Sequence, residues 1–428
     1  MKQAIQLATL SAANIVIAFL FQWYVITSIG PGIETDALFA GMTLPQLVLA
    51  VISGSLMHVL VPLLAGEEES EVRRDAWMFF VLVGGIFSFL AGGLYLSANL
   101  WVPYTVPGFD AKGLSLTIEL TRVQLIGMVF AAVNGVQWAA YHARQKFFFA
   151  DFTPIVASAV SFALLVWALP RYGVLAAAWI GTLRFALQTI FLAPGMGWPV
   201  RPNRDSAAIK AAWRRIKPLL LGTAYYKTDV LVDRLLLSTA ASGTLSLYYL
   251  AQQIYGAIIT VLNKAIATPL VPLLSSLSKS GDQLAFKRAY RARLLQVGVI
   301  SSVVLLALAL LGRWGLTLLI GYGNITSDDL DGLWWVMIWL GGMFFGGALG
   351  HITSATFYSV GDTVTPTRIG IISYTIYIPV KLASYLHFGV PGLAISTSIY
   401  FMANLVAQGL ILERRYVASG LVDRANQK

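Results

Sequence analysis

Residues 59–64, Val-Leu-Val-Pro-Leu-Leu, decide the fold together with residues 269–274, Pro-Leu-Val-Pro-Leu-Leu. Each stretch ends a long apolar segment, and Pro62 and Pro272 lie 210 residues apart in a chain of 428. A second echo joins residues 173–178, Gly-Val-Leu-Ala-Ala-Ala, to residues 389–394, Gly-Val-Pro-Gly-Leu-Ala. Because both echoes have nearly the half-chain offset and the same order, they predict an internal repeat.

The composition predicts a membrane protein. Hydrophobic residues make up 57% of the chain and charged residues 12%, about half the charged share of a soluble domain, which excludes a soluble enzyme. A transmembrane helix needs about 20 apolar residues, and the chain offers about twelve such segments. We therefore predict an all-α polytopic membrane protein with about twelve spans, at residues 4–29, 36–65, 76–101, 114–141, 153–170, 173–193, 217–240, 244–274, 292–320, 331–359, 367–387 and 392–412.

The distribution of basic residues predicts the orientation. Of the 30 Lys and Arg, 21 fall at the N-terminus, in the even-to-odd loops or in the C-terminal tail, whereas the opposite loops hold only Lys112 and Arg171. Basic residues gather in cytoplasmic loops, so both termini are predicted to be cytoplasmic. The same rule explains the net charge of +10 without a nucleic-acid partner.

The longest connector predicts the division into lobes. It is rich in Pro, Gly and basic residues and lies at the midpoint of the chain. We predict an N-terminal lobe at 1–193, a basic cytoplasmic linker at 194–216, a C-terminal lobe at 217–412 and a cytoplasmic tail at 413–428. Six spans in each lobe make the two lobes a parallel pseudo-repeat, as in transporters that rock about a central cavity.

Ionisable residues inside spans are costly, so each one is a candidate functional residue. Asp229 and Asp233 share one helix face at a spacing of four residues, and two such carboxylates in a membrane need a cation. Lys381, in the middle of the eleventh span, is the predicted partner. A structural ion pair, a site that couples a proton or cation to transport, and no contact at all remain alternatives.

Other polar residues within spans predict a substrate path. Arg184 and Lys264 lie deep enough to line a central cavity and attract an anionic head group such as a diphosphate; the alternative is snorkelling or structural pairing. The second and eighth spans are too polar to face lipid and add the neutral candidates Gln46, His58, Gln252 and Gln253. Glu119 and Arg122, three residues apart, are predicted to pair on their own helix.

No catalytic signature is present in the sequence. It has no nucleotide-binding loop, no nucleophile elbow and no histidine spacing typical of a zinc site, and it contains no cysteine. We therefore predict a protein that is not an enzyme and that needs no metal or cofactor.

Four stretches resemble the MviN/MurJ family of lipid-linked precursor flippases, in the multidrug, oligosaccharidyl-lipid and polysaccharide exporter superfamily. They cover the chain at wide spacing and in family order. They are residues 30–39 with Leu44-Pro45-Gln46 and Val61-Pro62, residues 233–236 with 242–244 and 249–253, residues 361–366, and residues 392–398.

The resemblance implies a transporter of the bacterial inner membrane that moves a polyprenyl-diphosphate-linked saccharide by alternating access, with membrane lipids and a coupling cation or proton as further partners. This chain departs from the family's cationic cavity, because Leu49-Ala50 and Gln253 stand where arginines are expected. An exopolysaccharide or O-antigen unit is therefore as plausible a substrate as lipid II. A cation-coupled exporter of small molecules and a non-transporting membrane scaffold are the alternatives.

Overall fold

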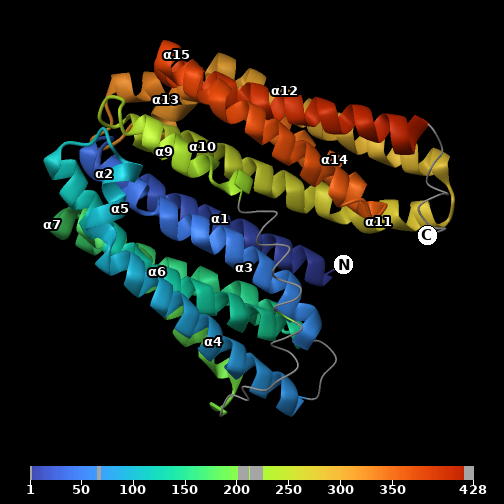
Figure 1. Ribbon diagram of the computed structural model, residues 1–428, viewed down its shortest axis with the longest axis horizontal. Coiled ribbons are helices and arrows are strands. Elements are labelled where there is room, and N and C mark those ends of the chain that lie inside the picture. Colours follow the sequence, from blue (N-terminus) through green and yellow to red (C-terminus); the bar gives the residue numbers. More distant parts are fainter. Residues whose placement is uncertain (1, 65–68, 201–211, 213–224, 419–428) are drawn as a thin grey trace. The chain divides into compact units, whose positions relative to one another are not determined.

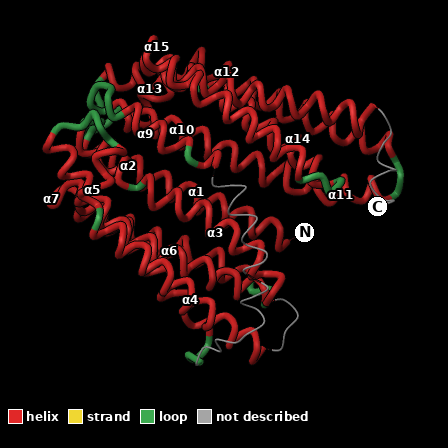
Figure 2. The backbone as a smooth tube through the Cα atoms, in the orientation of Figure 1, coloured by secondary structure: helices red, strands yellow, loops and turns green. Residues whose placement is uncertain are grey.

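The computed structural model describes residues 2–64, 69–200, 212 and 225–418. Every regular element within these ranges is a helix (Figure 2), which confirms the predicted fold class. The chain divides into two compact units. The first contains Met1–Ser246 and Tyr322–Ile325, and the second contains Leu247–Gly321 and Thr326–Lys428.

The first unit is organised around one long helix, α6, which packs against α2, α3, α4, α5 and α7. Half of the most apolar stretch of α6 is buried, so this helix forms the centre of the unit. The helices of the unit are α1 (Lys2–Ile29), α2 (Ile33–Gly41), α3 (Thr43–Leu64), α4 (Glu69–Leu96), α5 (Ala98–Thr105), α6 (Ala111–Ala143), α7 (Phe147–Met196) and α9 (Asp229–Leu237) (Figure 1).

In the second unit α14 packs against α11, α12 and α15. Its elements are α10 (Thr244–Leu262), the π-helical segment η1 (Asn263–Ala267), α11 (Thr268–Lys279), α12 (Gln283–Ile320), α13 (Ser327–Trp339), α14 (Gly341–Ser359), α15 (Val364–Leu412) and a second π-helical segment, η2 (Glu413–Ala418). The first three residues of α10 belong to the first unit.

The described helices account for most of the predicted membrane spans. Residues 217–224 of the predicted span 217–240 lie outside the described ranges, and α9 covers only part of the rest. Six described helices are long and apolar enough to cross a membrane, and the pair α13 and α14, bent by 45°, raises the number to seven. Two of the six, α7 and α15, each contain two predicted spans, and α2 with α3 and α4 with α5 each form one predicted span from two helices.

The first sequence echo has the same structural role in both units. Leu60 and Leu64 are buried in the core of the first unit, and Leu270 and Leu274 are buried in the core of the second. The proline between each pair of leucines is exposed, at Pro62 and at Pro272. The repeat predicted from the sequence is therefore visible in how these helices pack.

The second echo marks identical breaks in two long helices. Gly173 interrupts α7 at φ 60° and ψ −150°, and Gly389 interrupts α15 at φ 60° and ψ −140°. This backbone region is accessible almost only to glycine. The break separates the two spans within each helix at the same point of the repeat.

Alanine at either break is expected to destabilise the protein. A non-glycine residue in this conformation costs about 1–3 kcal/mol, so Gly173→Ala and Gly389→Ala should each lower the midpoint of thermal unfolding in detergent. Gly370→Ala is the matched control, because Gly370 is helical and a Cβ there has open space within 4 Å. Equal midpoints for all three variants would contradict the assigned role of the breaks.

The observed units divide the chain later than the predicted linker. Helix α9, predicted to open the second lobe, belongs to the first unit, where it packs against α3 and α5. Most of residues 194–216 lie outside the described ranges, so the predicted linker stays a prediction.

Candidate substrate site

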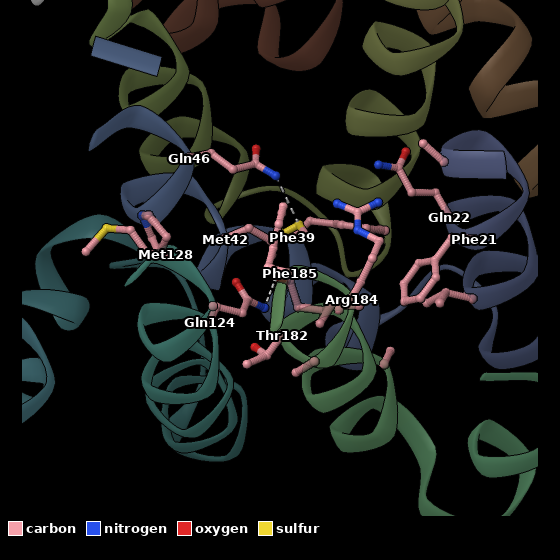
Figure 3. Close-up of a pocket in the computed structure, with 18 of the residues that line it drawn as sticks. Phe21, Gln22, Phe39, Met42, Gln46, Gln124, Met128, Thr182, Arg184 and Phe185 are labelled. Atoms are coloured by element: carbon pink, nitrogen blue, oxygen red, sulfur yellow. Dashed lines mark hydrogen bonds between the residues drawn. The ribbon is translucent and has the colours of Figure 1, made fainter. Parts of the chain in front are cut away.

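The first unit contains a largely apolar pocket of about 130 Å³ between α1, α2, α3, α6 and the second half of α7 (Figure 3). Its walls are mainly aromatic, aliphatic and methionine side chains, with Phe21, Phe39 and Phe185 as the aromatic part. Among the described residues that line it, Arg184 has the one charged side chain, and Gln22, Gln46 and Gln124 supply amides. Two predicted path residues, Arg184 and Gln46, therefore line the same pocket.

Local packing positions Arg184. The residue lies in the second half of α7, which turns after the break at Gly173, and α7 packs against both α1 and α6. The small residues Ala177, Ala178 and Gly181 line the pocket from the same helix, and small side chains allow helices to approach closely. The Arg184 guanidinium lies 4.7 Å from the centre of the Phe185 ring, a distance typical of a cation–π contact.

Two amides of the pocket were missed by the sequence analysis. The Gln124 Nε2 donates to the Leu38 carbonyl at 3.1 Å, whereas its buried Oε1 has no hydrogen-bond partner among the described residues. A buried acceptor without a partner is uncommon in native proteins and costly. These two residues, Gln22 and Gln124, could have been predicted because each is a glutamine within an otherwise apolar span.

Leu49, which stands where the resemblance implies an arginine, is part of the pocket wall. The positive charge here therefore comes from α7 through Arg184, and not from α3.

The remaining predicted path residues lie elsewhere in the chain. Gln252 and Gln253 are half-buried on α10, and Lys264 is exposed on η1, all three in the second unit. His58 lies on α3, but its side chain is outside the part of the structure that is described. The role of these four residues stays a prediction.

The predicted charged pair involves some of the most deeply buried ionisable groups. Asp233 on α9 is 1% exposed, Lys381 on α15 is 0% exposed, and Asp229 is half-buried. Within its own unit the Lys381 Nζ lies 5.0 Å from the centre of the Tyr377 ring, which stacks on Tyr400. The pairing of Lys381 with the aspartates stays a prediction, and the aromatic contact is new.

A buried acidic residue, Asp36, connects α2 with the start of α10. The Asp36 carboxylate on α2 accepts hydrogen bonds from the backbone N–H of Gly243 at 2.7 Å, the backbone N–H of Ser246 at 2.8 Å, and the Ser246 hydroxyl. Arg234 interacts electrostatically with Asp36 and donates from Nε to the Thr43 hydroxyl. Asp36 therefore holds the start of α10 against α2.

The predicted pair of Glu119 and Arg122 is wrong. Arg122 instead donates to the Tyr95 carbonyl and the Asn99 side chain, both at 3.3 Å, and lies over the Tyr95 ring. Glu119 is exposed. The tertiary contacts of Arg122 with α4 and α5 outweigh a weak pair on the helix surface.

Two helical units with repeated breaks and cores, six or seven helices long and apolar enough to cross a membrane, and an internal pocket lined by one arginine are typical of a polytopic membrane transporter. The family model described as lipid II flippase MurJ matches residues 25–423, and the chain therefore belongs to this family.

Individual relatives agree with this assignment. The probable lipid II flippase MurJ of Vibrio cholerae serotype O1 is 23% identical over 97% of this chain and 84% of the relative. The probable lipid II flippase MurJ of Buchnera aphidicola subsp. Acyrthosiphon pisum is 20% identical over 98% of this chain and 85% of the relative.

Solved structures share the fold. A lipid II flippase MurJ in an inward closed conformation matches 98% of this chain and 91% of its own, with a TM-score of 0.84 at 16% identity. An inward-facing multidrug resistance MATE family transporter of the MOP superfamily matches 99% and 95%, with a TM-score of 0.75 at 15% identity. At these identities the likeness shows the architecture alone.

Proposed function

We propose that this chain is a flippase that moves a polyprenyl-diphosphate-linked saccharide from the cytoplasmic to the periplasmic leaflet by alternating access. The observation that carries the proposal is the pocket around Arg184, in a chain that belongs to the MurJ family. A guanidinium binds phosphate oxygens with two parallel hydrogen bonds, and the amides of Gln22, Gln46 and Gln124 suit sugar hydroxyls.

The single arginine of the pocket limits what it recognises. Among the described residues that line it, Arg184 alone carries a charge, and a guanidinium matches the oxygens of a phosphate better than a neutral sugar. We infer that the pocket recognises the phosphates, which lipid II shares with other lipid-linked glycans.

Complementation tests the function and separates the substrates. The chain should rescue cells depleted of their own lipid II flippase if lipid II is its substrate. Failure at good membrane expression, with rescue of a strain lacking an exopolysaccharide or O-antigen flippase, would assign another lipid-linked glycan. Failure in all of these strains, with increased growth of an efflux-deficient host under toxic cations, would favour the small-molecule exporter.

Membership of the family implies a multi-pass protein of the inner membrane, and we propose that both termini are cytoplasmic. The chain contains no cysteine, so single cysteines report topology directly. In intact cells with a permeable outer membrane, an impermeant maleimide should label Asp328→Cys at the start of α13. It should label Ser280→Cys, after α11, only once the inner membrane is opened. The reverse pattern would invert the proposed orientation.

We also propose a coupling role for Asp229, Asp233 and Lys381. Ionisable groups within membrane spans are costly and mark ion or proton pathways, and Asp233 and Lys381 are 1% and 0% exposed, which supports binding of a proton or cation. The double variant Asp233→Asn, Lys381→Met should lose transport while keeping its membrane level. Full activity of this variant would argue against the proposal, and Lys227→Met, an exposed lysine close to α9, is the control.

A further inference from the structure

A second pocket of the first unit lies at a different place from the pocket around Arg184. It has a volume of about 380 Å³ and is formed by the start of α4, the connection between α6 and α7, and the end of α7. Residue 194 at this pocket follows Arg184 by ten positions, or about 15 Å along a helix. The two pockets are therefore separate sites.

The charge of this second pocket is positive. Arg73, Arg144 and Lys146 line it against one acidic residue, Glu69. Within the described ranges neither Arg73 nor Arg144 forms a salt bridge. The neighbouring Arg74 does, with Glu71. The described residues that line the pocket therefore carry three positive charges against one negative charge.

Two buried donors in the pocket lack acceptors. The Nε atoms of Arg73 and Arg144 are both buried without a hydrogen-bond partner in the described part of the chain. Buried N–H groups of this kind are rare in native proteins, and charged donors are the most costly to leave unsatisfied. An anion in the pocket would compensate the charge of both guanidinium groups.

The wall opposite α4 is closely packed. Arg144 donates to the Gly195 carbonyl, and the Trp77 Nε1 donates to the Gly197 carbonyl at 3.3 Å. A Cβ on Gly195 would lie 2.0 Å from the Tyr141 ring, and Gly197 has a φ of +70°. The segment 194–197 is therefore fixed by its glycines, and it holds Arg144 beside Arg73.

Aromatic side chains place this pocket at the edge of the bilayer. Trp198, directly after the pocket, is 85% exposed, and Phe148 and Phe149 at the start of α7 are also exposed. Exposed aromatic residues of this kind gather at the level of the lipid head groups. Basic pockets between transmembrane helices at this level bind phosphate-bearing lipids.

We propose that the pocket of Arg73, Arg144 and Lys146 is a binding site for a phosphate oxyanion, presented by the phosphodiester of an anionic membrane lipid or by free phosphate. The guanidinium groups of Arg73 and Arg144 contact the phosphate oxygens, and Lys146 adds a point charge. The bound anion connects α4 with the turn between α6 and α7 and stabilises this end of the first unit.

The test uses the full chain, purified and delipidated in a neutral detergent. Its midpoint of thermal unfolding is measured with added phosphatidylglycerol, with phosphatidylcholine, and with inorganic phosphate against chloride at equal ionic strength. A ligand that binds only the folded state raises the midpoint. Phosphatidylglycerol should raise the unfolding midpoint above the value measured with phosphatidylcholine. An equal rise with inorganic phosphate would identify the free ion as a sufficient ligand. A rise with phosphatidylglycerol alone would identify the lipid head group as the ligand.

Three variants decide whether the shift comes from this pocket. Arg73→Gln and Lys146→Gln should each lose at least half of the shift, and Lys146 is exposed, so its replacement leaves the fold intact. Arg74→Gln removes an adjacent arginine that does not line the pocket and should keep the whole shift. The proposal is overturned if neither anion shifts the midpoint, if Lys146→Gln keeps the full shift, or if Arg74→Gln loses as much as Arg73→Gln.

Discussion

Arg184→Ala is expected to abolish the rescue of flippase-depleted cells by this chain while leaving its level in the membrane unchanged. Among the described residues that line its pocket, Arg184 carries the one charge. A hydrogen bond to a charged group contributes about 1.5–3 kcal/mol, which corresponds to about a 10- to 150-fold loss of affinity for the diphosphate. Arg184→Lys keeps the charge without the fork of donors and should rescue partly.

The control for this experiment lies on the same helix. Arg171 is exposed and contacts the Trp167 ring, outside the pocket. Arg171→Ala should rescue as well as the unmodified chain. If cells with Arg184→Ala grow as well as cells with the unmodified chain, the pocket is not on the substrate path. An equal loss of rescue in both variants would indicate a general requirement for cations on α7.

Asp36→Asn is expected to give a large loss of stability. The Asp36 carboxylate accepts hydrogen bonds from two backbone N–H groups and one hydroxyl, all buried. An amide offers one oxygen in place of two and brings an N–H₂ group towards a donor, which leaves a buried donor unsatisfied at about 1–3 kcal/mol. Together with the lost charge, the total is about 3 kcal/mol, which should lower the midpoint of thermal unfolding by roughly 5–10 °C.

Glu34→Gln provides the comparison for Asp36. Glu34 lies two residues away on α2 and is half-buried, so its replacement tests the same helix without the buried network. Its midpoint should stay close to that of the unmodified chain. A fall in Glu34→Gln as large as the fall in Asp36→Asn would show that helix α2 tolerates no loss of charge, and the network would lose its assigned importance.

The positions of the spans could be predicted because membrane insertion depends on the length and hydropathy of short segments. The breaks at Gly173 and Gly389 were also predictable. Each lies between two predicted spans, at the first residue of the second sequence echo. The place of α9 could not be predicted in this way. Its grouping with the first unit depends on tertiary contacts such as that of Arg234 with Thr43, which a local pattern does not encode.

The candidate site was predictable to the extent that isolated charges reveal it. Arg184 was identified because an arginine within a span is costly, and Gln46 because its helix is too polar for lipid. Gln22 and Gln124 were missed because a single amide raises the polarity of its span only slightly. Arg122 was assigned the wrong partner for a related reason: spacing along a helix shows which side chains can meet, and the neighbouring helices decide which ones do.

The recurrence of buried leucines and glycine breaks in the two units bears on how this chain diversifies. Leu60 and Leu64 correspond to Leu270 and Leu274, and Gly173 corresponds to Gly389, whereas the pocket residue Arg184 has Tyr400 at the same offset as the glycines. A duplicated ancestor in which packing and breaks persist while cavity positions drift would produce this pattern. A substitution at a pocket position such as Arg184 therefore changes the lining of the cavity without touching the repeated core leucines or the glycine breaks.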